Sequence, residues 1–386
     1  MVDYFIHDQV FHLIIFLAVI LMILLTNIWI THRARRHSPP SQLPMVSILV
    51  PARNEERNIF SCIQSLLSQD YPCFEVLVLN DQSNDGTQEV LKRIATSHPS
   101  LHVFEGKPPP ENVVGKNWAC SQLALQASGE LLLFTDADTC HRSEMLRAVV
   151  TSFIGERADL LTGYPRQLVH SWGELLLVPF FSWVLFCFIP LVLGYQLHLP
   201  ILSSAVGQFM LFRRDAYLAI GGHESVKTSV VDDISLARRI KSARLSLRVV
   251  HIADLVSCRM YYSSREAVAG FTKNLFAFFD YRLLPFLFAF IWVLFMFWKP
   301  LFVLIAMIFG QSTNTQPATI AVCVVLSILL WLIHYVNVSF PFGLAFLYPF
   351  TILVNVGVAL RSCLYSIGGG LEWKGRKIAK SKWKWF

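Results

Sequence analysis

The chain has 386 residues, enough for two or three domain-sized units, and a formal net charge of +7. Hydrophobic residues make up 54% of it and charged residues only 15%, which excludes an ordinary soluble globular protein. Residues 46–170 have the charge content of a soluble domain, whereas residues 282–360 carry almost no charge. The composition therefore predicts a soluble domain joined to membrane segments.

The net charge of +7 lies largely in two clusters without acidic residues, HRARRH at 32–37 and KGRKIAKSKWK at 374–384. Basic clusters beside apolar segments are typical of the cytoplasmic face of a membrane, and we favour this interpretation over an RNA-binding patch. We therefore expect a bilayer, and no nucleic acid, as a partner. The eight cysteines are scattered without a CxxC pair or a zinc spacing, so reduced, structural thiols are expected.

The first apolar stretch, Val10 to Ile30, is uncharged over 21 residues. At ~1.5 Å per residue it can cross a hydrocarbon core of ~30 Å. No positively charged region precedes it and no small-residue cleavage site follows, so an anchor is favoured over a removed signal peptide. The arginines directly after it predict an outside N-terminus and a cytoplasmic domain in a multi-pass protein of the cell membrane.

Three further apolar stretches lie at 283–309, 318–338 and 341–360. Three full crossings would place the second basic cluster outside, against the expectation that it is cytoplasmic. Either one stretch is re-entrant or interfacial, or the number of crossings differs. The sequence leaves these alternatives open.

The apolar stretch at 174–194 carries a different expectation. A full crossing here would separate residues that the chemistry below requires in one site. Pro179 and Pro190 also interrupt a straight helix. We predict a segment that lies in the bilayer surface, with a buried pair of core helices as the alternative.

Between residues 45 and 138, β-branched strands alternate with amphipathic helices. Such alternation predicts an α/β domain with a mainly parallel sheet, in which ligands bind beyond the carboxyl ends of the strands. We expect strands within 45–56, 74–87, 101–106 and 130–138, and helices at 58–72, 88–99 and 115–129. Polar residues follow these strands at Asn54, Glu55, Asp81, Asp136 and Asp138.

Asp136 and Asp138 follow the apolar run LLLF with one residue between them. Because side chains alternate along a strand, both carboxylates are expected on the same side. Neighbouring carboxylates stay ionised most easily around a cation, and a divalent metal can neutralise a nucleotide diphosphate as it leaves. The alternative is a polar turn after a buried strand.

Six motifs occur in order along the chain: VPARNEE, LNDQSNDGT, GKNWA, TDAD, GGH and VVDD. Together they resemble the membrane-associated family 2 glycosyltransferases over roughly residues 44–280. The resemblance implies a GT-A fold (a Rossmann-like, mainly parallel sheet) flanked by N-terminal and C-terminal transmembrane helices. It also implies inverting transfer of a sugar from a nucleotide sugar, with Mn²⁺ or Mg²⁺ as the cofactor.

The resemblance assigns roles to the motif residues. It implies that Pro51, Ala52 and Glu55 line the nucleotide pocket, that Asp81 accepts hydrogen bonds from the base, and that Lys116 helps to hold the nucleotide. Asp136 is expected near the ribose and Asp138 on the metal. The structural alternatives are an Asx turn around Asp81 and Asp85, and a surface lysine at a helix start for Lys116.

Asp232 and Asp233 open an amphipathic helix, so they form an N-cap pair or the catalytic acids. In the family the second member of this pair takes the proton from the attacking hydroxyl, which implies Asp233 as the base and Asp232 as its support. The preceding segment resembles the acceptor side of the family, with Gly207, Gly221, Gly222 and His223 as candidates. Ordinary turn glycines and a loop histidine are the alternatives there.

The chain lacks the Q/R-x-x-R-W motif of processive polysaccharide synthases in the matching region, 258–274, which argues against such a synthase. Arg259 and Lys273 are candidates for replacing that motif's cation at the diphosphate. The same region and LEWKGRK at 371–377 resemble the branch that glycosylates carotenoids, the hydroxychlorobactene and diaponeurosporenoate glycosyltransferases. This implies UDP-glucose as the donor and a membrane-dissolved polyisoprenoid as the acceptor.

Three alternatives stay open: a glycolipid synthase acting on a diacylglycerol, sphingoid or polyprenyl phosphate, a polysaccharide synthase, and a non-catalytic membrane scaffold. For the domains, we expect an anchor and basic flank at 1–40, a GT-A domain at 41–280, and membrane helices with a basic tail at 281–386.

Overall fold

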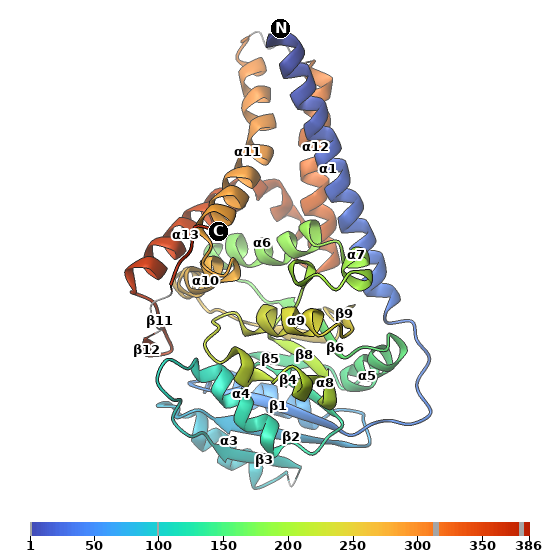
Figure 1. Cartoon of the computed structure of the whole chain (residues 1–386), viewed down its shortest axis with the longest axis vertical. Coiled ribbons are helices and arrows are strands. Elements are labelled where there is room, and N and C mark those ends of the chain that lie inside the picture. The colour runs from blue at the N-terminus through green and yellow to red at the C-terminus, as the bar shows by residue number, and fades with distance from the viewer. Residues whose placement is uncertain (1, 99, 312–315, 378–381) are drawn as a thin grey trace.

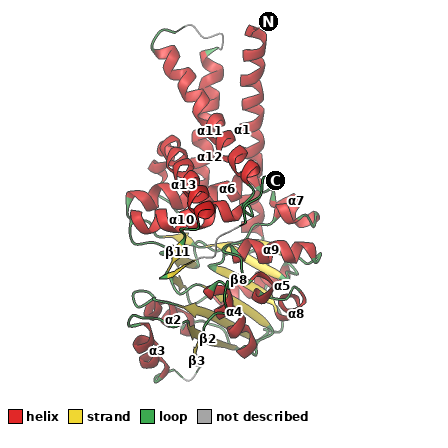
Figure 2. Cartoon of the chain, turned by 60° about the vertical axis from the view of Figure 1, so that its left-hand side comes forward, coloured by secondary structure: helices red, strands yellow, loops and turns green. Residues whose placement is uncertain are grey.

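The predicted mainly parallel sheet forms one end of the molecule, and long helices project from the other end (Figures 1 and 2). The computed structural model describes residues 2–98, 100–311, 316–377 and 382–386. Seven strands follow the order β3-β2-β1-β4-β8-β6-β9, and only β8 runs antiparallel to its neighbours. They are β1 (Val46–Ala52), β2 (Phe74–Asn80), β3 (Leu101–Glu105), β4 (Leu131–Thr135), β6 (Leu160–Tyr164), β8 (Phe209–Arg213) and β9 (Leu247–His251).

Apolar side chains of the central strands alternate between the two faces of the sheet, and helices cover both faces. Ile48 and Val78 pack toward α2, α3 and α5, whereas Leu49 and Phe134 pack toward α4, α8 and α9. These helices are α2 (Ile59–Leu67), α3 (Thr87–Ala95), α4 (Gly115–Gln126), α5 (Met145–Gly155), α8 (Arg214–Ala219) and α9 (Asp232–Ser242). The sheet order places β1 between β2 and β4, so the polar segments after these three strands emerge side by side.

The fourth strand is shorter than predicted. It ends at Thr135, and Asp136 to Asp138 form the turn that leads into the short strand β5 (Thr139–His141). The Thr139 hydroxyl donates to the Asp136 carbonyl at 2.7 Å, and the Thr135 hydroxyl donates to the Gln208 carbonyl at 2.8 Å. Thr135 is the last residue of β4 that pairs with β8, so the two carboxylates are presented by a turn instead of a strand.

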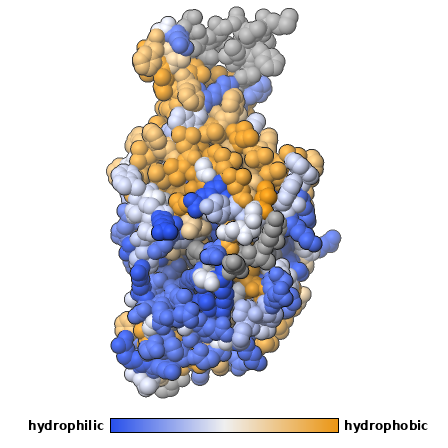
Figure 3. Space-filling model, turned by 90° about the vertical axis from the view of Figure 1, so that its left-hand side faces the viewer, coloured by the Kyte–Doolittle hydropathy of each residue, from blue (hydrophilic) through white to orange (hydrophobic). Residues whose placement is uncertain are grey.

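Four described helices are long and apolar enough to cross a membrane. Figure 3 shows an apolar surface over the helical part of the molecule and a hydrophilic surface over the sheet domain. The helices are α1 (Val2–Arg33), α11 (Leu283–Ile308), α12 (Pro317–Asn337) and α13 (Tyr348–Gly368), with η3 (Phe342–Leu347) leading into the last.

The long helices point in two directions (Figure 1). Helices α1, α11 and α12 run along the long axis away from the sheet, whereas α13 inclines across it and ends beside the sheet domain. His32 Nε2 at the end of α1 lies 3.1 Å from Asn337 Oδ1 at the end of α12, so these two helices finish at the same level. Trp298 Nε1 of α11 donates to the Pro349 carbonyl at the start of α13, 3.1 Å away.

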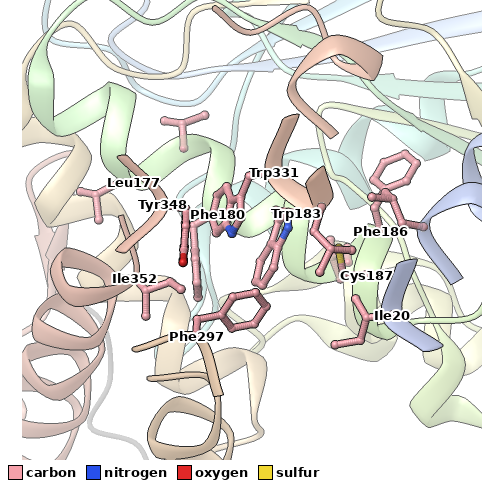
Figure 4. Packing of buried hydrophobic residues seen from close by; sticks show 14 of the residues in the cluster. Ile20, Leu177, Phe180, Trp183, Phe186, Cys187, Phe297, Trp331, Tyr348 and Ile352 are labelled. Carbon is pink, nitrogen blue, oxygen red and sulfur yellow. The ribbon is translucent and has the colours of Figure 1, made fainter. Parts of the chain in front are cut away.

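The apolar stretch at 174–194 forms α6 (Trp172–Phe188) and the start of α7 (Leu191–Gln196), which lie across the long axis beneath the projecting helices (Figure 1). Trp183 of α6 stacks on Trp331 of α12 with ring centroids 4.3 Å apart, and both side chains are fully buried (Figure 4). The segment is therefore packed among α1, α11, α12 and α13, the environment of the core-helix alternative, and it lies between the projecting helices and the sheet domain (Figure 1).

The expected interruption at Pro179 is wrong, because α6 continues through it. Asn355 of α13 donates to the Leu176 carbonyl at 2.8 Å, next to the Leu175 carbonyl that Pro179 leaves without its helical donor. The break falls at Pro190, where the Asn27 amide of α1 donates to the carbonyls of Phe186 and Ile189 at 2.8 Å each. Membrane and interfacial helices keep proline when neighbouring groups satisfy the freed backbone in this way.

The remaining elements connect the two parts. A small sheet combines β5 with β7 (Arg166–Gln167) and β10 (Val256–Cys258), and β11 (Glu372–Trp373) pairs with β12 (Arg376–Lys377). Helix α10 (Ser264–Phe278) joins the sheet domain to α11, and the short helices are η1 (Pro200–Leu202) and η2 (His223–Val226).

Candidate active site

A cavity of about 1510 Å³ lies between the carboxyl ends of the strands and the helix cluster. It is lined from the sheet side by polar groups and from the helix side by apolar groups. Of the residues predicted from the sequence, those lining it are Pro51, Ala52, Glu55, Asp81, Lys116, Asp136, Asp138, Gly207, Asp232 and Asp233. The structure therefore brings together side chains from five separate motifs.

The carboxylates after β4 face the base of α4. Lys116 Nζ in the first turn of α4 lies 2.7 Å from Asp136 Oδ1 and 3.9 Å from Asp232 Oδ2. Burial lowers the pKa of the Lys116 ammonium, but the charges of Asp136 and Asp232 outweigh it and hold the pKa well above its usual value. Lys116 is thus a permanent cation between two acidic motifs, not a lysine on the outer surface.

Asp138 has acidic neighbours from two sequence motifs, Asp136 and Glu55. Burial, followed by the negative charges of Asp136 and Glu55, raises the pKa of Asp138 to about 7. The Cys258 thiol on β10 donates to Asp138 Oδ1 at 3.4 Å. A cation bound beside Asp138 would stabilise its ionised form, which burial and the neighbouring negative charges disfavour.

Asp136 and Asp138 fit a divalent cation that takes only one or two of its ligands from the protein. Among the described residues, no three acidic, cysteine or histidine side chains converge as a complete metal site. Mg²⁺ and similar ions are commonly bound by one or two carboxylates, with water and substrate phosphates as the other ligands. Asp138, with Asp136 beside it, matches that donor set.

Asp232 and Asp233 do not cap the helix that they open. The N-cap of α9 is Val231, and no side chain makes the capping hydrogen bond. Asp233 accepts from the backbone N–H groups of Gly207 at 2.9 Å and Ile234 at 2.8 Å. Burial and the charge of Asp232 raise the pKa of Asp233 to about 6, within the range where a carboxylate can accept a proton near neutral pH.

The candidate acceptor-side residues separate into two groups. Gly207 lines the cavity, and its N–H positions Asp233. Gly221, Gly222 and His223 lie outside the cavity lining. A Cβ on Gly222, which has φ +49°, would lie 2.5 Å from the Tyr217 ring, so this glycine makes room for an aromatic side chain.

His223 lies behind Asp232. It is buried, its Nδ1 lies 2.9 Å from the Tyr217 hydroxyl, and its Nε2 lies 3.8 Å from Asp232 Oδ2. Burial lowers the pKa of His223 to about 4, so the ring is neutral near pH 7. This histidine supports Asp232 from outside the cavity.

The loops after β1 and β2 hold each other in place. The Asn54 side-chain oxygen accepts from Asn84 N at 2.8 Å, and the Glu56 N–H donates to Asp85 at 3.2 Å. Asp85 also accepts from the N–H of Thr87 at 3.1 Å, so it shapes the turn as the structural alternative proposed. The carboxylate of Asp81 is not used in this turn and faces the cavity.

Asp81 and Glu55 have partners that the sequence did not predict. Arg376 of β12 binds the two carboxylate oxygens of Asp81 at 2.6 and 3.1 Å, and Lys374 forms an ion pair with Glu55. These cations belong to the basic tail, which the charge pattern assigned to the membrane surface. A long separation along the chain, 295 residues for Asp81 and Arg376, hides such a pair from local sequence patterns.

Of the two cations considered as replacements for the missing motif, Lys273 of α10 lines the cavity. Arg259 lies outside the lining, with its guanidinium 4.2 Å from the centre of the Tyr262 ring. Burial and the nearby Lys116 lower the pKa of Lys273 to about 8. Lys273 therefore remains a candidate for contact with an anion, and Arg259 is held by an aromatic ring.

The other end of the cavity is apolar. Its walls come from α6, α10 and the segment after α12, all of which belong to the helix cluster. The side chains are Val178, Phe181, Phe271, Phe278, Val338 and Phe340. The cavity is therefore continuous from the carboxylates at the strand ends to these apolar side chains.

Residues 47–221 match the family model described as glycosyl transferase family 2. This part of the chain is therefore similar to the family 2 glycosyltransferases. The chain is also similar to glycosyltransferase AglE of Haloferax volcanii, at 32% identity over 125 residues, which are 32% of the chain and 40% of that protein.

A second similarity confirms the predicted likeness to the carotenoid branch. The 4,4'-diaponeurosporenoate glycosyltransferase of Staphylococcus haemolyticus is 25% identical over 239 residues, 60% of each chain. The chain thus spans 60% of this relative and 40% of the Haloferax protein.

A solved mannosyltransferase from Pyrobaculum calidifontis, in complex with GDP-Man and Mn²⁺, superposes with a TM-score of 0.52 at 18% identity. The superposition covers 92% of this chain and 98% of that one. At this identity the likeness concerns the fold, and it supports the predicted GT-A domain with flanking apolar helices.

Proposed function

We propose that this chain is a membrane-bound, metal-dependent, inverting glycosyltransferase that moves a sugar from a nucleotide sugar onto a lipid-soluble acceptor. The observation that carries the proposal is the single cavity, which has carboxylates at the strand ends and apolar side chains from α6 and α10 at the other end. A donor with a charged diphosphate fits the first part. An oily acceptor fits the second, and a water-soluble acceptor would gain nothing from it.

The donor is assigned to the strand ends. Pro51, Ala52 and Glu55 line the pocket beside β1, Asp81 accepts from the base, and Asp136 lies near the ribose. Lys116 contributes a permanent positive charge at this end. Asp138 would hold Mn²⁺ or Mg²⁺, which when bound neutralises the negative charge of the departing diphosphate.

Asp233 acts as the general base. It removes the proton of the acceptor hydroxyl as that oxygen attacks the anomeric carbon, while the bond from the anomeric carbon to the diphosphate oxygen breaks. Attack from the face opposite the leaving group inverts the configuration. The backbone N–H groups of Gly207 and Ile234 fix the orientation of the Asp233 carboxylate, and Asp232 supports it by raising its proton affinity.

For the substrates we propose UDP-glucose as the donor and a polyisoprenoid, such as a carotenoid, as the acceptor. The similarity to the diaponeurosporenoate glycosyltransferases and the apolar cavity wall support the acceptor class. Because the solved mannosyltransferase was determined with GDP-Man, GDP-mannose belongs among the donors to be tested.

We also propose that α1, α11 and α12 cross the membrane and that the sheet domain is cytoplasmic. In Figure 1 these three helices leave the sheet domain in one direction, whereas α13 returns to it. Three crossings place the N-terminus outside and both basic clusters inside, which removes the conflict in the sequence pattern. A green fluorescent protein fused to the C-terminus should then fluoresce in cells, and a dark, periplasmic fusion would contradict this topology.

The enzymatic proposal is tested with membrane fractions incubated with a panel of labelled nucleotide sugars, with and without chelator, followed by mass analysis of extracted lipids. We expect a glycosylated lipid that disappears with chelator and whose yield falls in Asp138→Asn. Asp215→Asn is the matched control, because this carboxylate is exposed on α8. A polymeric product would indicate a polysaccharide synthase, and no transfer or hydrolysis from any donor would indicate a scaffold.

A further inference from the structure

The C-terminal hairpin of β11 and β12 reaches into the sheet domain. Its two strands are joined by Lys374 and Gly375, both with positive φ, at +46° and +75°. Two such residues in succession form the tight hairpin turn whose twist matches the flanking strands. The turn places the side chains of Lys374 and Arg376 in the cavity lining, more than 290 residues from their partners.

Arg376 is held at the end of the cavity where Asp81 lies. Its guanidinium binds Asp81 through two nitrogens and donates to the Gln82 side-chain oxygen at 3.1 Å. The Asp81 side chain is only 5% exposed, so this ion pair is largely shielded from water. A Cβ on Gly115 would lie 2.2 Å from Arg376 Nη1, so the start of α4 accommodates the guanidinium only because a glycine stands there.

Lys374 is held by the loop that follows β1. Its ammonium donates to the Arg53 carbonyl at 2.9 Å and pairs with Glu55, while Arg53 Nε donates back to the Lys374 carbonyl at 3.3 Å. Glu55 follows β1, which is the neighbour of β4 in the sheet, and Lys374 lines the same cavity as Asp138. Lys374 therefore lies at the end of the cavity where Asp138 would meet a diphosphate.

The charges of the cavity explain why a hairpin of this kind is useful. The strand-end motifs contribute the carboxylates of Glu55, Asp81, Asp136 and Asp138, which repel an anionic donor. Lys116 pairs with Asp136, and a metal at Asp138 would compensate a further part of this charge. The two cations of the hairpin pair with the other two carboxylates, Glu55 and Asp81, and a carboxylate bound to one guanidinium still has lone pairs for a second donor.

We propose that the hairpin Glu372–Lys377 closes the donor site, with Arg376 fixing Asp81 for the base and Lys374 binding the diphosphate. This rests on the proposed function, because it names further donor-binding residues of the same site. In this proposal Arg376 acts on binding of the base and Lys374 on binding of the diphosphate. If the hairpin had a purely structural role, loss of either cation would affect both parts of the donor alike.

The test compares a nucleoside with its diphosphate. Purified full-length protein is titrated with UDP and with uridine, and in parallel with GDP and guanosine, and the pair that the wild type binds is used for the variants. Lys374→Ala should weaken binding of the diphosphate by about tenfold while leaving the nucleoside unchanged. Lys374→Arg should restore the diphosphate affinity, since it keeps the charge.

Arg376→Ala should weaken nucleoside and diphosphate alike, by about tenfold, because the base-recognising carboxylate loses its positioning partner. Lys384→Ala is the matched control on the same tail, because this exposed lysine lies outside the cavity lining. It should bind both ligands as the wild type does.

Three results overturn the proposal. Unchanged diphosphate binding in both alanine variants shows that the hairpin takes no part in donor binding. Tighter binding shows that it is a plug that the donor must displace, and equal loss of both ligands in Lys374→Ala shows a structural role. Failure of the wild type to bind any nucleotide instead refutes the proposed function and this inference with it, so the two failures are distinguishable.

Discussion

Replacing Asp233 with asparagine separates chemistry from folding at the proposed base. Asparagine has nearly the same shape but cannot take up a proton from the acceptor hydroxyl. A positioned base contributes about 10²–10⁴-fold to a rate, so turnover of Asp233→Asn should fall by about that factor. Binding of the nucleotide should persist, because Asp233 lies on α9 and the donor residues lie at the ends of β1, β2 and β4.

The structure also bounds the change in the free energy of unfolding. Burial and Asp232 raise the Asp233 pKa from 3.8 to about 6, so keeping this carboxylate ionised at neutral pH costs about 3 kcal/mol. Asparagine removes that cost, but its single oxygen can accept from only one of the N–H groups of Gly207 and Ile234. The N–H left without an acceptor costs about 1–3 kcal/mol. The two effects nearly cancel, and the variant should remain folded.

The assay measures transfer of labelled sugar into extracted lipid, with nucleotide binding and the melting temperature recorded on the same preparation. Asp215→Asn serves as the control for loss of an exposed aspartate. Turnover within about threefold of the wild type would refute the assignment of the base, because a threefold loss is far smaller than the contribution expected of a positioned base. Loss of nucleotide binding together with turnover would show instead that the site had collapsed.

Three further predictions follow from the same structure. Activity should rise with pH as Asp233 ionises, reaching half of its maximum near pH 6 and levelling off at higher pH, and a flat profile across that range would argue against Asp233 as the base. Because the folded pKa lies above the ordinary value of 3.8, the stability that Asp233 contributes falls as pH rises from that value to about 6. EDTA should abolish transfer, Mn²⁺ or Mg²⁺ should restore it, and Asp138→Asn should raise the metal concentration for half-maximal activity; an unshifted metal titration would remove Asp138 from the metal site. Trp183→Ala should lower the free energy of unfolding by about 3–5 kcal/mol, measured as a lower melting temperature in detergent. Phe288→Ala is the control, because that side chain is 65% exposed and its loss should change the melting temperature little. Equal effects of the two substitutions would contradict the packing in Figure 4.

Local patterns predicted the sheet domain because the apolar periodicity of each strand and helix there is visible within a few residues of sequence. Apolar residues such as Ile48 and Leu49 alternate along β1, and polar groups follow β1, β2 and β4 at their carboxyl ends. In a parallel sheet those ends meet at one edge, so Glu55, Asp81 and Asp136 were expected to converge, and they do line one cavity. The end of β4 was missed because its pairing with β8 stops at Thr135, and the Thr139 hydroxyl closes the turn that follows by donating to the Asp136 carbonyl.

The sequence by itself determined an α/β domain similar to the family 2 glycosyltransferases, with apolar flanking helices, because periodicity and motif spacing are local properties of the chain. Only the tertiary structure decided that α13 turns back toward the sheet domain and that Arg376 and Lys374 meet Asp81 and Glu55 (Figure 1). A basic tail has the same composition whether it lies on lipid or fills an acidic cavity. Its destination depends on carboxylates some 300 residues away, which are brought within reach only when the helix cluster packs onto the sheet.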